Sequence, residues 1–329
     1  MSRIVYFHKI GGPEVLQIEN VEVAPPAAGE VRIRVKALGL NRAESMFRMG
    51  QYLIEPKFPS RLGYEASGIV EAIGTGVSDL FPGDVVSVIP VLDQGKYGVY
   101  GEIATVPVKF VVKHPSSLSF EEAAAVWMQY MTAYGALIDI AAIKSGDYVV
   151  IPAASSSVGL AAIQICNMVG AISIATTRKR DKKQALLNAG ASHVIVTEEE
   201  HLTDRLNDIS KNKGVRVVFD PVGGKTVLDL AAGMATGGIL FQYGALSPEP
   251  TPFPLFIALA KSLTMRGYVL FEILNDEIRF NNAKQFVLDA LSMGKLKPII
   301  AKTFPLDEIM QAHRYLESNS QIGKIVVTV

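Results

Sequence analysis

The fold of this chain is decided at residues 148–159, which read Tyr-Val-Val-Ile-Pro-Ala-Ala-Ser-Ser-Ser-Val-Gly. The apolar run at the start is typical of a buried strand, and the small residues after it predict a tight turn. A helical pattern opens at Ser157 and continues as Leu-Ala-Ala-Ile-Gln-Ile-Cys. Small side chains in such a turn let the backbone approach a pyrophosphate, and the helix N-terminus presents free N–H groups and a positive dipole end. The stretch therefore predicts a dinucleotide site.

Strand and helix patterns alternate from this stretch to about residue 269. The predicted strands are 148–152, 171–176, 193–197, 216–220, 237–242 and 263–269. The predicted helices are 157–169, 180–189, 199–211, 224–234 and 254–261. Six strands joined by crossover helices predict an α/β fold with a doubly wound parallel sheet.

The first 115 residues have a different, β-rich pattern. Residues 31–37 alternate apolar and polar side chains, as a half-buried strand does, and further short strands separated by glycine-containing turns follow. They predict a partly open β-barrel. After a helix at about 276–292, a final strand pair at 299–303 and 324–329 returns to this domain. The expected division of the chain is 1–121 (first domain), 122–271 (dinucleotide-binding domain) and 272–329 (return to the first).

The composition excludes several classes of protein. With 49% hydrophobic and 19% charged residues, the 329-residue chain can form large cores and is not generally disordered. Lys+Arg and Asp+Glu both number 32, so no net charge attracts nucleic acid or an anionic membrane. The single cysteine, Cys166, excludes an intramolecular disulfide and a multi-cysteine zinc site. No signal peptide or membrane span is visible, and we expect a soluble cytoplasmic protein.

The order of these patterns and several short motifs resemble the medium-chain dehydrogenase/reductase superfamily over nearly the full length. The motifs are Gly63-Tyr-Glu-Ala-Ser-Gly68, Pro82-Gly-Asp-Val-Val86, Gly101-Glu102, Ala153 to Gly159, Asp220-Pro-Val-Gly-Gly224 and Gly323-Lys-Ile-Val326. The resemblance implies a GroES-like catalytic domain and a Rossmann NADP-binding domain.

Two substitutions distinguish this chain from the zinc-dependent branch of the superfamily. Asn41 and Tyr64 stand where that branch has a metal-binding Cys and His. A catalytic zinc needs three protein ligands, and the five histidines are scattered without ligand spacing. The chain therefore resembles the zinc-independent branch, the quinone oxidoreductases of zeta-crystallin type and the related enoyl reductases, and we expect no metal.

The predicted cofactor is NADP(H). An NAD site usually has an acidic residue at the end of the second strand, where it binds the ribose 2′-hydroxyl. Here Thr177 is followed by Arg178, Lys179 and Arg180, and no acid appears before Asp181. Arg178 or Arg180 can pair with a 2′-phosphate, and Thr177 can donate a hydrogen bond to it.

Further cofactor contacts are expected along the chain. The pyrophosphate is expected at Ser155, Ser156, Ser157, Val158 and Gly159, where serines stand in place of some glycines of the G-x-G-x-x-G pattern. The resemblance implies that Tyr243 and Gly244 line the adenosine side, and that the backbone of Gly267 and Tyr268 meets the nicotinamide. It also places Gln129 and Thr132 near the nicotinamide or substrate and directs Lys324 toward the cofactor.

The chemistry needs a group that stabilises or protonates the anion formed by hydride transfer. In the resembling reductases, the segment that corresponds to Asn41–Tyr52 borders the nicotinamide, and its tyrosine is a proposed proton donor. Tyr52 is thus the first catalytic candidate, with packing on Pro56 or Phe58 as the alternative. Tyr64 is the second, with core packing as the alternative.

Three hypotheses on function follow. The first is an NADPH-dependent reductase of small quinones or α,β-unsaturated carbonyls that works without zinc. The second is an enoyl-thioester reductase, whose carrier would require basic residues such as Arg42, Arg48 and Lys57 near the site. The third is a non-catalytic NADPH-binding structural protein. The resemblance also implies a homodimer formed through the edge of the Rossmann sheet, and no nucleic-acid or membrane partner is expected.

Overall fold

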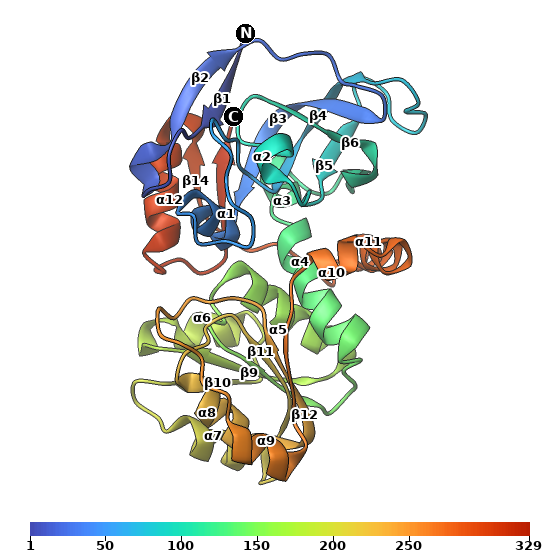
Figure 1. Ribbon diagram of the computed structural model, residues 1–329. Helices are drawn as coiled ribbons and strands as arrows, with labels where there is room; N and C mark the ends of the chain where they lie inside the picture. The colour runs from blue at the N-terminus through green and yellow to red at the C-terminus, as the bar shows by residue number, and fades with distance from the viewer. The chain divides into compact units, whose positions relative to one another are not determined.

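The computed structural model describes all residues, 1–329, which form two compact units (Figure 1). Unit 1 comprises Met1–Met128 and Pro298–Val329, and unit 2 comprises Gln129–Lys297. The first unit is discontinuous, and the divisions between the units fall after Met128 and after Lys297, later than the 121/122 and 271/272 of the sequence-based division. The reason for the later second division is that two C-terminal helices, α10 (Phe271–Leu274) and α11 (Glu277–Ser292), pack within unit 2.

Contacts of α11 with the start of unit 2 explain this placement. Arg279 forms an ion pair with Asp139 at 2.6 Å between Nη2 and Oδ2. The ring of Phe286 packs against Tyr134 with centroids 4.9 Å apart. These groups are far apart in sequence, so the pattern of α11 alone did not indicate its partner.

Unit 2 contains one parallel sheet of six strands in the order β10-β9-β8-β11-β12-β13. Their bounds are β8 Tyr148–Ile151, β9 Ile172–Thr177, β10 His193–Val196, β11 Val215–Asp220, β12 Met234–Gln242 and β13 Thr264–Gly267. All six were predicted within a few residues. The order runs outward in both directions from β8 and β11, which confirms the doubly wound sheet.

Five helices cover this sheet, α5 and α6 on one face and α7, α8 and α9 on the other (Figure 1). Their bounds are α5 Ser157–Val169, α6 Lys183–Asn188, α7 Leu202–Ser210, α8 Thr226–Ala232 and α9 Leu255–Lys261. Because both faces are covered, the strands carry nearly continuous apolar runs, and Val150, Ile174, Ile195, Val218 and Leu240 share one core cluster.

The apolar stretch 123–143 is mostly helical. It contains the end of α3 (Phe120–Ala123), then α4 (Trp127–Tyr134) and a π-helical turn at Gly135–Ile140. Glycine is needed at 135, because a Cβ there would lie 2.1 Å from the hydroxyl oxygen of Tyr268. No helix in the chain combines the length and apolar character that a membrane span requires.

Unit 1 is built on a seven-stranded sheet that does not close into a barrel. The strands are β3 Glu30–Leu40, β4 Glu65–Ile73, β5 Val85–Val88, β6 Ile103–Pro107, β7 Val111–Lys113, β14 Ile300–Pro305 and β15 Lys324–Thr328. The order is β14-β15-β3-β4-β5-β7, and β6 also pairs with β3. Since Ile325 lies opposite Leu40 in the antiparallel β15–β3 pair, Lys324 arrives next to the end of β3.

Smaller elements complete the fold. They are the β1–β2 hairpin (Ser2–Tyr6, Gln17–Val21), the helices α1 (Arg42–Arg48), α2 (Gln94–Tyr97) and α12 (Ile309–Glu317), and the 3-10 turns η1 (Pro13–Val15), η2 (Val108–Phe110), η4 (Arg180–Lys182) and η5 (Leu306–Glu308). Helix α1 starts directly after β3, with Asn41 as its N-cap residue and Glu44 as the acidic partner of a capping box.

Candidate functional site

The predicted phosphate loop joins β8 to α5 and depends on small residues. Ser156 is the N-cap residue of α5, and its Oγ accepts the Gly159 N–H at 3.1 Å. A Cβ on Gly159 would lie 2.6 Å from the Cα and the carbonyl oxygen of Ala154, so no larger residue fits there. Ala153 has a φ of +48°, in the left-handed region that favours glycine. The loop is therefore held close to the helix start, where N–H groups can bind an anion.

A basic cluster surrounds the end of β9. Arg178 and Lys179 are exposed, whereas Arg180 forms an ion pair with Glu199 at 2.5 Å between Nη2 and Oε2. The Lys182 Nζ donates to the Ser155 Oγ at 3.2 Å, which brings a further cation to the phosphate loop. Partial burial lowers the pKa of Lys182. Arg178 is thus the arginine in this cluster that is not already paired with a carboxylate.

Four other predicted cofactor residues of unit 2 lie at the ends of β12 and β13, at the same edge of the parallel sheet as the phosphate loop: Tyr243, Gly244, Gly267 and Tyr268. The ring of Tyr243 stacks on Phe219, with centroids 4.0 Å apart, and burial raises the pKa of its phenol. Gly244 is close to the backbone, since a Cβ there would lie 2.7 Å from the Pro221 carbonyl oxygen. Gly267 is exposed, whereas Tyr268 is buried and its backbone N–H donates to Gln242.

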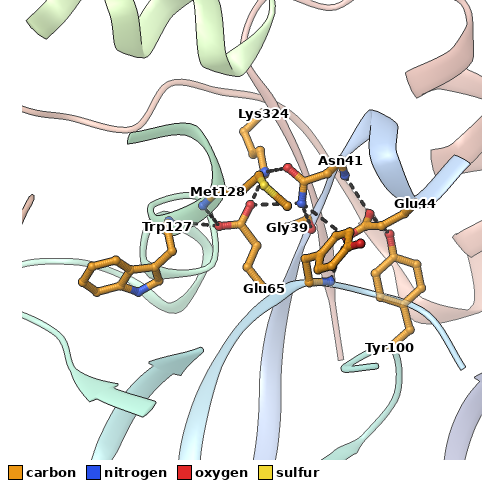
Figure 2. Close-up of polar contacts among 9 residues, drawn as sticks. Gly39, Asn41, Glu44, Glu65, Tyr100, Trp127, Met128 and Lys324 are labelled. Atoms are coloured by element: carbon orange, nitrogen blue, oxygen red, sulfur yellow. Dashed lines mark hydrogen bonds and ion pairs between the residues drawn. The ribbon is translucent and has the colours of Figure 1, made fainter. Parts of the chain in front are cut away.

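Unit 1 contains a buried network of polar side chains, drawn in Figure 2. Asn41, Glu44, Glu65 and Lys324 are each at most 6% exposed. The Lys324 Nζ donates to the Asn41 Oδ1 at 2.6 Å and forms an ion pair with Glu65. The Asn41 Nδ2 donates to Glu65 Oε1 at 3.2 Å and to Glu44 Oε1 at 3.3 Å. Three segments of the chain therefore meet at Asn41.

Both oxygens of the Glu44 carboxyl group accept hydrogen bonds. Its Oε2 accepts the Tyr100 hydroxyl at 2.5 Å and the Asn41 N–H at 2.7 Å, and its Oε1 accepts the Tyr64 N–H at 2.9 Å. Burial nevertheless dominates and raises the pKa of Glu44 to about 7. The group can therefore exchange a proton near neutral pH.

Glu65 connects the network to helix α4. While its Oε1 faces Lys324 and Asn41, its Oε2 accepts the N–H groups of Trp127 and Met128 at 3.0 and 3.1 Å. These N–H groups belong to the first turn of α4. The same helix carries the predicted residues Gln129 and Thr132, both buried.

The two candidate tyrosines interact with each other. Burial raises the pKa of both Tyr52 and Tyr64. The interaction between their side chains raises the pKa of Tyr64 further and partly offsets the rise in the pKa of Tyr52. Tyr64 is 1% exposed, and Tyr52 is half-buried. The Phe58 ring contacts Phe7, with centroids 5.7 Å apart. The structure thus brings Asn41, Tyr52 and Tyr64 together around Glu44.

A zinc ion does not fit these side chains. No group of three or more His, Cys, Asp or Glu residues anywhere in the chain could hold a metal ion. Around Asn41, where zinc ligands would be needed, the side chains are the Asn41 amide and the carboxylates of Glu44 and Glu65. The Lys324 ammonium already pairs with Glu65. Cys166 is buried in α5, and burial raises the pKa of its thiol to about 12.

Four residues with clear roles in these sites were not assigned from the sequence. They are Glu44, Glu65, Tyr100 and Lys182. The Asn-x-x-Glu spacing of a capping box was a signal for Glu44, and the basic run 178–183 was one for Lys182. Glu65 and Tyr100 carried no local signal, because their partners are 24 or more residues away.

Comparison with known proteins identifies the family. The alcohol dehydrogenase GroES-like domain matches residues 27–116, and the zinc-binding dehydrogenase domain matches residues 157–288. The chain is 33% identical to quinone oxidoreductase 1 of Escherichia coli, over 98% of both chains. It belongs to the medium-chain dehydrogenase/reductase superfamily. This membership confirms the predicted GroES-like and Rossmann domains.

Other relatives in the superfamily are also oxidoreductases. The chain is 30% identical to a 2-haloacrylate reductase of Burkholderia, over 99% of both chains. Among solved structures, it is similar to Escherichia coli quinone oxidoreductase complexed with NADPH, with a TM-score of 0.91 and 32% identity over the whole of both chains. The comparisons therefore support an enzyme of the oxidoreductase class.

Proposed function

We propose that this protein is an NADPH-dependent reductase that transfers hydride to a quinone or an α,β-unsaturated carbonyl compound without zinc. The observation that carries the proposal is the set of groups around Asn41. The two interacting phenols of Tyr52 and Tyr64 can hydrogen-bond an oxygen anion beside this network, but the set lacks the ligands for zinc. Relatives named as quinone and haloacrylate reductases support the same substrate class.

The groups of unit 2 are assigned to cofactor binding. Bound NADPH would supply the hydride. The N–H groups at the start of α5 bind the pyrophosphate, and the small residues 153–159 allow its approach. Arg178 and Thr177 bind the 2′-phosphate, and the Lys182 ammonium adds positive charge beside Ser155. The similar structure that contains NADPH supports this choice over NADH.

The groups of unit 1 are assigned to the acceptor. A quinone or enone that receives hydride becomes an oxyanion, which must be hydrogen-bonded or protonated. Tyr52 is half-buried and burial raises its pKa, so its phenol is protonated at neutral pH, as an ordinary tyrosine is, and can donate a hydrogen bond to this oxygen. Tyr64 interacts with the Tyr52 phenol and orients it.

Oxidation of NADPH and NADH by the purified protein, with a quinone, an enone and an enoyl thioester as acceptors, tests the proposal. We expect turnover of the quinone or the enone, with a kcat/KM about 10-fold or more higher for NADPH than for NADH. NADH has no 2′-phosphate, so the side chains that bind this phosphate lose a hydrogen-bond partner, which costs binding energy of this size. Metal analysis of the same sample should show activity without zinc. A preference for NADH, or activity that follows zinc content, would contradict the proposal.

Two other outcomes would favour the alternatives. Preferential turnover of the thioester would indicate an enoyl-thioester reductase. However, Arg42 donates to Leu316 and Asn319, and Arg48 pairs with Glu317, so neither is free to bind a carrier. NADPH binding without turnover of any acceptor would indicate a non-catalytic binding protein.

We also infer that two copies of the chain pair along β13. This strand lies at the end of the sheet order and pairs only with β12. Just before it, α9 and the preceding residues expose apolar side chains, among them Phe253 (62%), Phe256 (81%) and Leu259 (68%). An unpaired edge next to exposed apolar groups is typical of an interface.

A further inference from the structure

Lys324 is a buried cation whose position needs an explanation. It is the first residue of β15 and is 1% exposed. Its ammonium pairs with Glu65 and donates to the Asn41 Oδ1 at 2.6 Å. A buried ion pair seldom stabilises a fold more than well-packed apolar residues would. Stability alone therefore does not explain a lysine at this place.

The ammonium holds the oxygen of the Asn41 amide in place. An ammonium can only donate, so the atom that faces it must be the Asn41 carbonyl oxygen. The amide nitrogen then donates to Gly39, Glu44 and Glu65, all three of which offer oxygen acceptors (Figure 2). Without the ammonium, the amide oxygen loses its donor, and only the acceptors around the amide nitrogen still hold the side chain.

The ammonium also acts on α4 through Glu65. Its attraction holds the Glu65 carboxylate so that Oε2 accepts the N–H groups of Trp127 and Met128. A carboxylate at this end satisfies helix N–H groups that lack partners within the helix and interacts favourably with its dipole. Gln129 and Thr132 follow on the same helix, so their backbone positions depend on this turn.

We propose that Lys324 is a positioning residue, whose ammonium holds the Asn41 amide oxygen and, through Glu65, sets the first turn of the helix that carries Gln129 and Thr132. The proposal rests on the proposed function, in which these residues serve the nicotinamide and the acceptor. It replaces the expectation that Lys324 itself reaches the cofactor, because its ammonium is enclosed by Glu65 and Asn41.

The test compares Lys324→Met with the double variant Lys324→Met/Glu65→Gln. The single variant leaves the Glu65 carboxylate buried without its counter-ion, which destabilises the fold. The double variant removes both charges, so its melting temperature should return toward that of the wild type. Val327→Ala, on the same strand, is the matched control because it loses a buried side chain without touching the network.

Turnover separates positioning from stability. We expect kcat to fall about 10- to 100-fold in Lys324→Met and to remain low in the double variant, since misplaced groups cost rate in this range. The dissociation constant of NADPH should stay within about 3-fold, because the phosphate contacts lie in unit 2. The fluorescence emission of bound NADPH, which reports the surroundings of the nicotinamide, should change in both variants. Val327→Ala should lower only the melting temperature.

Three results would overturn the proposal. They are unchanged kcat in Lys324→Met, recovery of kcat together with stability in the double variant, and an equal loss of kcat in Val327→Ala. Failure of the proposed function is distinguishable, because it would appear in the wild type as NADPH binding without turnover. In that case the proposal is tested by the emission of bound NADPH, and unchanged emission in Lys324→Met would contradict a positioning role of Lys324.

Discussion

At the scale of single residues, Glu44 makes the stability of this protein depend on pH. Its pKa in the folded state is about 7, above the 4.5 of an exposed glutamate, because burial disfavours the charged form. The folded state therefore holds the proton more tightly. The resulting stabilisation is fully present below pH 4.5 and is lost as the pH rises toward 7.

Glu44→Gln should remove this dependence. Between pH 4.5 and pH 7 the wild type should lose on the order of 3 kcal/mol of unfolding free energy relative to the variant. Burial lowers the pKa of His313 to about 3, so this residue makes the unfolding free energy rise with pH. It does so equally in both proteins and cancels in the difference between them. Urea unfolding of both proteins across this pH range gives the difference, and parallel curves would show that Glu44 does not titrate there.

The tyrosine pair is the other prediction at this scale. Tyr52→Phe should lower kcat with a quinone or enone by about 100-fold, the usual contribution of a general acid. Tyr64→Phe should lower it less, because Tyr64 acts on the Tyr52 phenol. The double variant should be no worse than Tyr52→Phe alone, since the two groups act as a unit. Steady-state kinetics of the three variants would contradict this pairing if the two losses multiplied.

At the scale of elements, the turn between β8 and α5 is limited by space. A methyl group on Gly159 would meet the Ala154 backbone at 2.6 Å, which no small side-chain movement relieves. Gly159→Ala should therefore displace the turn and weaken NADPH binding by about 10-fold or more, as the loss of charge-assisted hydrogen bonds would. Titration of NADPH fluorescence measures this. Gly95→Ala is the control, because its Cβ would meet other atoms only at 3.4 Å or more.

The elements also explain what was predictable from the sequence. The parallel strands of unit 2 are buried on both faces, so their apolar runs, as at residues 148–151, were visible directly. Helix α1 is seven residues long, too short for a clear helical period, although its Asn41-x-x-Glu44 capping box was present. The Asn41–Lys324 contact spans 283 residues and arises from the pairing of β15 with β3. Only tertiary structure reveals such a contact.

At the scale of the whole molecule, the inferred assembly is a symmetric dimer. Two β13 edges related by a two-fold axis would continue the six-stranded sheet of one copy into that of the other. The same axis would bring the exposed side chains of the two α9 segments toward each other. Such an interface would bury the unpaired edge of β13 and the exposed apolar side chains of the α9 segment.

Phe256→Glu should disrupt this dimer. Phe256 is 81% exposed in the single chain, so the substitution leaves the fold of the monomer intact but places a charge in the apolar interface. Ile278→Glu is the control, because Ile278 is 74% exposed on α11, outside the α9 segment and β13. Light scattering after size exclusion should give twice 35.5 kDa for the wild type and the control, and about 35.5 kDa for Phe256→Glu. A monomeric wild type would contradict the inferred dimer, and a Phe256→Glu variant that remains dimeric would place the interface elsewhere.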